Sequence, residues 1–342
     1  MATILEDVKR ILIIRCGALG DLIYATVMID AVTKQYGKDV KIDVVATPGP
    51  GAILAHDLRV NTIYPLKHRK VPIFLSREKQ NIIQASKTLD YDLLINLEEN
   101  KHFDKLATKI NAKHKVGSPF TSPKLKSGQR HMVDIIKQTL APFCSDAVLD
   151  ISLPKLFGSS YENVQKQYTL PDKYIVFSPS NSHSNRNKIN YRAWPQHHWK
   201  KLLSMIPAHI PVVIIGGKGE EAYFAAIKPY PSNVIDLSGK TPLVDLITII
   251  DHAEMILTTD TGPAHLASAV DTDITVLIGP TPVSLTGPYP TPNITINIIS
   301  QNLPCSPCYN TDVMKNCQDN ICMKQITPSA VFKGIQPTLD TF

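Results

Sequence analysis

Long hydrophobic runs that could cross a membrane are missing from this sequence. The longest stretch without a charged residue, residues 274–311, contains seven prolines, and prolines inside a helix break the hydrogen bonding that a membrane span needs. A secretory signal is missing as well. The first apolar run, residues 11–14, is short, is flanked by Arg10 and Arg15, and leads to no small-residue cleavage site. We therefore expect a cytoplasmic protein.

Strong charge imbalance, short repeats and low-complexity segments are also absent. The net charge of +6 is a modest excess that selects no partner by itself, and we expect no nucleic-acid partner. With 43% hydrophobic and 19% charged residues, the composition is globular and excludes a disordered chain. The 342 residues exceed what one hydrophobic core usually holds, which favours two domains. The six cysteines are interpreted as thiols or metal ligands, since no export signal is present.

The sequence does contain two successive series of apolar, β-branched runs separated by segments of helical length. The first comprises residues 10–15, 40–47, 91–97 and 114–117; the second comprises residues 174–180, 211–217, 233–239, 253–259 and 273–279. Continuous apolar runs are typical of parallel strands buried on both faces. They predict an α/β protein of two doubly wound domains, residues 1–165 and 166–342. The proline-rich residues 279–293 are expected to form a long irregular loop.

The first candidate site follows the first strand, in the sequence RCGALGD of residues 15–21. Gly17 and Gly20 bracket a tight turn into a helix, without the GxGxxG fingerprint of dinucleotide sites. Asp21 falls in the first helical turn, where a carboxylate complements the helix dipole by about 0.3–1 kcal/mol. The alternative is that Asp21 acts as an acid or base at the carboxyl edge of the sheet, where open α/β folds bind ligands.

The second candidate site is the sequence TTDTGPAHLASAV of residues 258–270. Asp260 and Thr261 follow a strand, Gly262 gives backbone freedom, and the next helix carries His265. Backbone N–H groups at a helix start suit a diphosphate. Asp260 would repel phosphate, so it is better suited to accept hydrogen bonds from sugar hydroxyls. The simpler alternative is an N-capping turn with an incidental histidine.

Two more loops of the second series carry charged residues. Residues 178–203 contain Ser180, Arg186, Lys188 and Arg192. The three cations are suited to stabilise a phosphate leaving group, unless the loop is only a solvated basic surface. Residues 216–227 place Glu220 after a glycine-rich turn. This carboxylate is either a first-turn acid that favours the helix dipole or a ligand of ribose hydroxyls.

A cysteine-rich segment follows the last expected strand. It contains Cys305, Cys308, Cys317 and Cys322. A CxxC pair followed by two more cysteines is close to the Cys₄ pattern of zinc or iron sites, although the second pair does not have the usual spacing. Free thiols or a disulfide are the alternatives.

Taken together, three segments resemble glycosyltransferase family 9, the ADP-heptose:lipopolysaccharide heptosyltransferases: ILIIRCGALGDLIYATVMIDAV, LSGKTPLVDLITIIDHAEMILTTDTGPAHLASAV and CSPCYNTDVMKNCQDNICMKQITPSAV. The resemblance spans residues 10–331. It implies a GT-B fold, with two Rossmann-like domains facing across a cleft. It also implies a nucleotide-diphosphate sugar donor bound mostly by the C-terminal domain and an acceptor bound mostly by the N-terminal domain. The implied reaction inverts the anomeric centre and needs no catalytic metal or other cofactor, so a zinc or iron on the cysteines would be structural.

The resemblance also implies roles for individual residues. Asp21 matches the general base, and Glu220 matches the acid that contacts the ribose. The expected donor site comprises Gly17, Gly20, Ser180, Lys188, Arg192, Glu220, Asp260, Thr261, Gly262 and His265. The expected reaction moves a heptose from an ADP-sugar to an anionic lipopolysaccharide-core acceptor at the inner-membrane surface. A protein heptosyltransferase, a sugar-nucleotide epimerase or hydrolase, and a non-catalytic binding protein are the alternatives.

Two features bear on how the substrates bind. The family usually has a lysine two residues before Trp-Pro, where this sequence has Arg192, with Lys188 four residues upstream. Either cation could contact the diphosphate, with different geometry. Residues 101–130 carry eight basic residues against one acid, Asp104. This segment is expected to attract a phosphorylated lipid acceptor or an anionic membrane surface, unless it is only a solvated surface.

Overall fold

The computed structural model describes residues 4–67, 69–122, 131–180 and 189–342. The chain divides into two compact units, Met1–Phe157 and Gly158–Phe342. This division comes before the expected boundary at residue 165, so helix α7 (Tyr161–Tyr168) belongs to the second unit. The buried Asp245 fixes this assignment, because it accepts hydrogen bonds from the hydroxyls of Ser159 (2.6 Å) and Tyr168 (2.8 Å).

The first unit is built on a five-stranded sheet with the order β3-β2-β1-β4-β5. Its strands are parallel and comprise β1 (Arg10–Arg15), β2 (Lys41–Ala46), β3 (Val60–Pro65), β4 (Tyr91–Asn96) and β5 (Ala112–Gly117). The helices are α1 (Leu19–Tyr36), α2 (Pro48–Gly51), α3 (Arg77–Leu89), α4 (Lys101–Lys109), α5 (Met132–Gln138) and α6 (Asp146–Ile151), with the short 3₁₀ helices η1 (Ala52–Leu54) and η2 (Ile73–Leu75).

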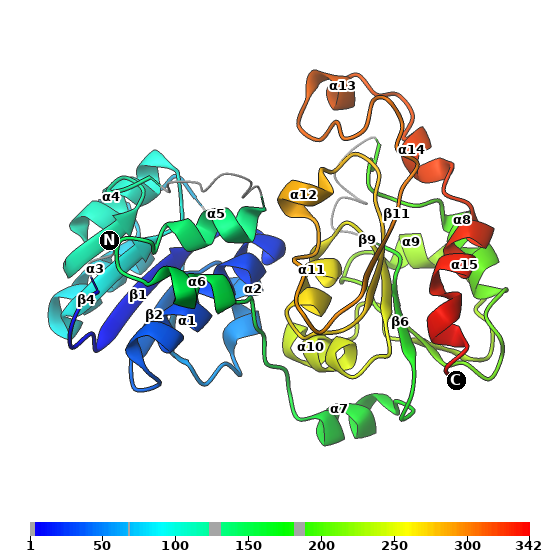
Figure 1. The fold of residues 1–342 in the computed structure, drawn as a ribbon, viewed down its shortest axis with the longest axis horizontal. Helices are drawn as coiled ribbons and strands as arrows, with labels where there is room; N and C mark the ends of the chain where they lie inside the picture. Colours follow the sequence, from blue (N-terminus) through cyan, green and yellow to red (C-terminus); the bar gives the residue numbers. More distant parts are fainter. Residues whose placement is uncertain (1–3, 68, 123–130, 181–188) are drawn as a thin grey trace. The chain divides into compact units, whose positions relative to one another are not determined.

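Helices cover both faces of this first sheet (Figure 1). Alternate residues of β1 point to opposite faces. Leu12 and Ile14 pack in a cluster with Phe103 and Leu106 of α4 and Ile82 of α3. On the other face α1 packs with α5 and α6. Burial on both faces explains why the strands are continuous apolar runs.

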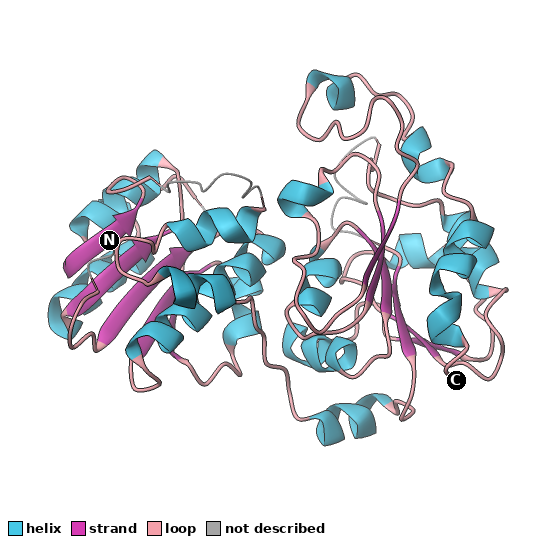
Figure 2. Cartoon of the chain, in the orientation of Figure 1, coloured by secondary structure: helices cyan, strands magenta, loops and turns pink. Residues whose placement is uncertain are grey.

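The second unit repeats this plan with a six-stranded sheet of the order β11-β10-β9-β6-β7-β8. Its parallel strands are β6 (Ile175–Ser178), β7 (Val212–Ile214), β8 (Val234–Asp236), β9 (Ile256–Thr259), β10 (Ile274–Leu277) and β11 (Ile296–Ile299). The helices are α7, α8 (Gln196–Leu203), α9 (Glu221–Ala225), α10 (Leu243–Asp251), α11 (Gly262–Ser268), α12 (Val283–Thr286), α13 (Asp312–Lys315), α14 (Ile321–Lys324) and α15 (Pro328–Leu339). Figure 2 shows α10 and α11 on one side of the sheet and α8 and α15 on the other.

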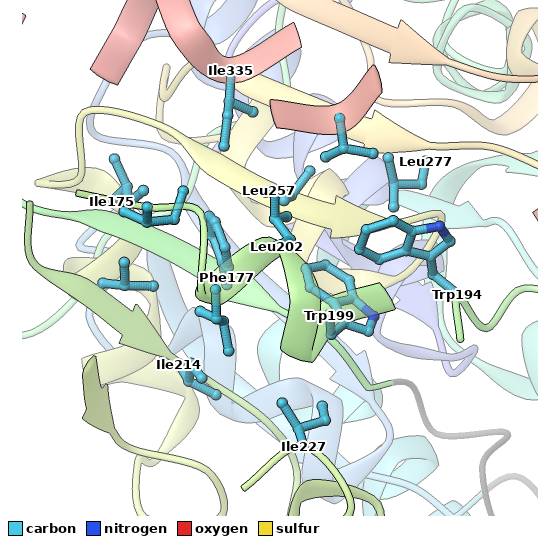
Figure 3. Close-up of a cluster of buried hydrophobic side chains, with 14 of the residues drawn as sticks. Ile175, Phe177, Trp194, Trp199, Leu202, Ile214, Ile227, Leu257, Leu277 and Ile335 are labelled. Carbon is cyan, nitrogen blue, oxygen red and sulfur yellow. The ribbon is translucent and has the colours of Figure 1, made fainter. Parts of the chain in front are cut away.

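The core between this sheet, α8 and α15 is centred on two tryptophans (Figure 3). Trp194 and Trp199 are fully buried and meet edge to face, with ring centres 4.9 Å apart. The indole N–H of Trp194 donates a 2.8 Å hydrogen bond to the Ile326 carbonyl. The chain around Trp194 is therefore held firmly at the carboxyl end of the sheet, which matters for the neighbouring Arg192.

The expected strands are all present, and the expected fold of two doubly wound parallel units is confirmed. Two strands, β3 and β11, were not expected from the sequence. Both are edge strands with mostly half-exposed residues, so they lack the continuous apolar pattern. The predicted irregular loop 279–293 contains the short helix α12. No helix formed by the described residues is long and apolar enough to span a bilayer.

Candidate functional site

Each unit has one point where the chain changes direction across its sheet. In the first unit this point lies between β1 and β4, because β2 and β3 follow on one side of β1 and β4 and β5 lie on its other side. In the second unit it lies between β6 and β9. Loops diverge at the carboxyl ends of such strand pairs and leave a crevice in which open α/β folds bind ligands. The candidate residues lie at these two edges, one edge in each unit.

Asp21 lies in the first turn of α1, directly after β1. One carboxylate oxygen, Oδ1, is 2.9 Å from Nη2 of Arg15, and the other, Oδ2, accepts a 3.0 Å hydrogen bond from the Ala18 backbone N–H. Its side chain remains 41% exposed, so a substrate can reach it. Gly17 leaves room for this carboxylate, because a Cβ at that position would lie 2.6 Å from Asp21 Oδ2. Gly20 is the second residue of α1.

Arg15 connects Asp21 to a second carboxylate at the same edge. Its Nη1 donates to the Leu97 carbonyl at 2.8 Å and lies 3.7 Å from Oε1 of the buried Glu98. The same Glu98 oxygen accepts the Cys16 backbone N–H at 2.8 Å. The Nε of Arg15 is buried and has no hydrogen-bond partner among the described residues. Arg15 is the last residue of β1, and Glu98 follows the end of β4. In the sequence, only their position at the end of an apolar run distinguished them.

A hollow of about 730 Å³ opens beside Arg15. Its polar floor comes from the ends of β4 and β5 and includes Glu98 and Ser118, and its apolar wall comes from α5. The side-chain amide of Asn96 donates to the carbonyls of Glu98 (3.2 Å) and Ser118 (2.6 Å) and so holds the floor together. A polar floor beside an apolar wall suits a sugar ring, which has hydroxyl edges and C–H faces. No sequence motif pointed to this hollow.

In the second unit, Arg192 and Asp260 form the centre of the candidate site. Nη1 of Arg192 donates to the Asp260 carbonyl at 3.1 Å and lies 3.5 Å from its Oδ2. Asp260 is only 3% exposed, and its Oδ2 has no hydrogen-bond partner among the described residues. The sequence suggested that Asp260 accepts hydrogen bonds from a sugar. In the structure it faces Arg192, so it also orients the guanidinium.

The rest of this turn leads from Asp260 into helix α11. Thr261 precedes α11, and its hydroxyl donates to the Thr259 carbonyl at 3.2 Å. Gly262 is the first residue of α11, and His265 is buried within the same helix. The predicted sequence of strand, turn and helix is therefore present, with the helix start at the edge of the sheet next to β6.

Ser180 and Glu220 meet at the adjacent edge of the same sheet. Oε2 of Glu220 accepts the Ser180 hydroxyl at 2.5 Å and the Gly217 backbone N–H at 2.8 Å. Ser180 follows β6, and Glu220 caps α9 after β7. Residues far apart in the sequence thus form one polar pair, in which Glu220 has oxygen capacity left to accept hydrogen bonds from a ligand. Lys188 lies outside the described residues.

The cysteine-rich segment packs directly on the Arg192 loop. The Tyr309 ring lies under the Arg192 guanidinium at 4.6 Å. The Tyr191 hydroxyl donates to the Cys317 carbonyl at 3.4 Å, and the Asn320 side chain donates to the carbonyls of Asn190 (3.2 Å) and Ala193 (3.1 Å). Sequence analysis missed this link, because a contact between residues about 120 positions apart leaves no local pattern.

The four cysteines of this segment are all free thiols. Burial, together with the nearby thiols of Cys305 and Cys317, raises the pKa of Cys308. Burial chiefly, with the same neighbours contributing, raises the pKa of Cys322 to about 11. The thiols therefore lie near one another, yet the described residues form no group of three or more metal-ligating side chains placed to hold a metal ion. As they stand, these cysteines do not form a closed metal site.

Two lysines of the basic segment 101–130 have structural partners. Nζ of Lys113 lies 2.7 Å from Oδ1 of Asp92. Nζ of Lys115 donates to three carbonyls at the end of α4, the shortest contact being 2.6 Å to Ile110. Residues 123–130 lie outside the described residues. Lys101 and Lys105 of α4 are exposed, so the attraction expected of this segment depends more on them than on Lys113 and Lys115.

A comparison with known protein families decides the assignment. Residues 84–318 match the model of glycosyltransferase family 9 (heptosyltransferase). The chain belongs to this family. Among curated proteins, it is 22% identical over 284 residues to lipopolysaccharide heptosyltransferase 3 of Escherichia coli, covering 77% of this chain and 81% of that protein. The resemblance inferred from the motifs is thus confirmed.

Solved structures give the same fold. The family 9 glycosyl transferase of Veillonella parvula superimposes with a TM-score of 0.78 at 17% identity, covering 100% of both chains. E. coli ADP-heptose lps heptosyltransferase II gives 0.73 at 18% identity, covering 97% of this chain and 99% of that one. The iron-containing dodecameric glycosyltransferase TibC of enterotoxigenic E. coli gives 0.56 at 13% identity, covering 98% and 79%. The family 9 glycosyltransferase therefore has the expected GT-B fold.

Proposed function

We propose that this protein is an inverting heptosyltransferase that transfers a heptose from an ADP-sugar to an anionic lipopolysaccharide-core acceptor. The observation that carries the proposal is the geometry of Asp21. Its carboxylate is exposed at the carboxyl edge of a parallel sheet, oriented by Arg15 and the Ala18 N–H, and lies next to the hollow that Arg15 lines. A general base needs this combination of fixed orientation and access to the substrate.

In the proposed reaction, the acceptor sugar occupies the hollow of the first unit. Asp21 accepts the proton of the attacking hydroxyl while that oxygen bonds to the anomeric carbon of the donor and the bond from this carbon to the diphosphate breaks. Attack from the side opposite the leaving ADP inverts the anomeric centre. The apolar wall from α5 would support the ring, and Arg15 would attract an anionic group of the acceptor.

The donor is proposed to bind at the edge of the second unit. Glu220 accepts hydrogen bonds from the ribose, with Ser180 fixing its orientation. Arg192 and the backbone at Gly262 neutralise the charge that develops on the departing diphosphate. In this assignment the Asp260 carboxylate accepts from the donor sugar and holds Arg192 in place. The proton transfer and the charge stabilisation use protein groups alone, so the proposal includes no catalytic metal.

The cysteine-rich segment is proposed to be structural, because four of its contacts hold the Arg192 loop in shape. A zinc or iron bound there would need the cysteines to draw closer together than they lie in this structure. We also propose that the protein works in the cytoplasm, beside the inner membrane, where a lipid-linked acceptor is accessible.

One assay separates this function from its alternatives. The protein is incubated with ADP-heptose, with and without a lipopolysaccharide inner-core acceptor, and ADP and the anomeric configuration of the product are followed. The proposal requires ADP release that depends on the acceptor and a product of inverted configuration. ADP release to water alone would identify a hydrolase, and an altered donor without ADP release would identify an epimerase. Transfer to a polypeptide but not to the core acceptor would identify a protein heptosyltransferase.

A further inference from the structure

A short helical turn of the first unit presents large apolar side chains to solvent. In η2, Phe74 is 76% and Leu75 is 66% exposed. Side chains of this size are seldom displayed side by side unless the surface meets an apolar partner. Nothing in the proposed reaction uses them.

The turn is held in place by the helix that follows it. The side-chain amide of Gln80 donates to the carbonyls of Ile73 (3.1 Å) and Phe74 (2.9 Å). Lys79 is 2% exposed, and its Nζ donates to the Val71 carbonyl at 2.6 Å. These side-chain hydrogen bonds hold the turn in the conformation that exposes Phe74 and Leu75.

Basic side chains lie on one side of the apolar turn, next to the start of α4. A hollow of about 590 Å³ lies between the segment 70–74 and the start of α4, and Lys70, Lys101 and Lys105 line it. All three lysines are exposed, as are Lys67 and Arg69 just before them. The nearby Asp104 of α4 accepts a 2.8 Å hydrogen bond from the Ser118 hydroxyl.

We propose that η2 and these lysines dock the protein on an anionic phospholipid bilayer. Phe74 and Leu75 would enter the boundary between head groups and acyl chains, and the lysine side chains would meet the lipid phosphates. Two exposed apolar side chains beside a cluster of lysines match both layers of such a surface, which is apolar at depth and negatively charged above. An apolar protein partner would not require this cluster of positive charge.

This inference rests on the proposed function in one respect, because a lipid-linked acceptor gives the docking its purpose. It extends that function by naming the membrane-contacting element. Docking itself is measurable without ADP-heptose or acceptor, so the two proposals fail separately.

The test is flotation of the full chain with vesicles of phosphatidylcholine alone and of phosphatidylcholine mixed with phosphatidylglycerol. Wild-type protein should bind the mixed vesicles and bind the neutral ones weakly. The double variant F74S/L75S should lower the partition coefficient on mixed vesicles by about tenfold or more, since it removes the apolar anchor. The pair K101Q/K105Q should reduce the difference between the two kinds of vesicle.

Leu58→Ser is the matched control. Leu58 is 100% exposed in the same unit, and its replacement should leave vesicle binding unchanged if the effect belongs to η2. All these side chains are exposed, so the melting temperatures should stay close to that of wild type. The inference is overturned if wild type binds neither vesicle, if F74S/L75S binds as well as wild type, or if light scattering shows that η2 instead joins two copies of this chain.

Discussion

The guanidinium carbon of Arg192 lies 4.6 Å from the centre of the Tyr309 ring. Tyr309 belongs to the cysteine-rich segment, and Arg192 contacts Asp260 in the turn before α11. The cysteine-rich segment and the turn at Asp260, which are far apart in the sequence, therefore both contact Arg192. The cysteine-rich segment forms a support for the cation that is proposed to face the diphosphate.

Replacing Tyr309 with leucine should weaken the binding of ADP roughly two- to fivefold, the effect of losing one partly exposed cation–π contact. Tyr309→Phe keeps the ring and should bind ADP like wild type. Isothermal titration calorimetry of both variants measures the difference. Equal affinity of Tyr309→Leu and wild type would mean that the ring does not help to place Arg192.

Replacing Asp21 with asparagine should reduce turnover by ~10²–10⁴, the usual range for a lost general base. Donor affinity should stay within a few-fold of wild type, because Asp21 is not proposed to contact the nucleotide. Turnover is measured as ADP release with a verified acceptor, and donor affinity by calorimetry. A variant with nearly wild-type turnover would show that Asp21 serves only the first turn of α1.

Glu220→Gln should weaken ADP binding by about tenfold, because a charge-assisted hydrogen bond to the ribose is lost. Inorganic pyrophosphate has no ribose, so its affinity should not change. The neighbouring Glu221, which accepts a 3.0 Å hydrogen bond from the Gly219 N–H, provides the control: Glu221→Gln should bind both ligands normally. A parallel loss of ADP and pyrophosphate binding in Glu220→Gln would argue for a general distortion of the turn.

The Cys₄ interpretation requires the four cysteines to come together around a metal ion, and it then predicts roughly one zinc or iron per chain in protein purified without chelator. The raised thiol pKa values of Cys308 and Cys322 mean that these groups are protonated at neutral pH without metal. Metal binding must then release protons, so retention of the metal should fall as the pH is lowered. Elemental analysis after dialysis at several pH values measures this. Metal-free protein with full activity would reduce the cluster to free thiols.

The sequence by itself determined the elements that depend on local pattern. Buried parallel strands form apolar runs, so most strands of both sheets were predictable: β1, β2, β4, β5 and β6 to β10. The half-exposed edge strands β3 and β11 were not. The turns at Asp21 and Asp260 were also visible, because glycine and polar residues crowd together where a strand becomes a helix.

Tertiary structure alone decided which of these residues meet. Glu98 joins Arg15 across 83 positions, Ser180 joins Glu220 across 40, and Tyr309 supports Arg192 across 117. Such pairs form because parallel strands bring their carboxyl ends to one edge, whatever the length of chain between them. The exposure of Phe74 and Leu75 was equally hidden, since an apolar run in the sequence normally predicts burial and only the packing of α3 shows that this one faces outward.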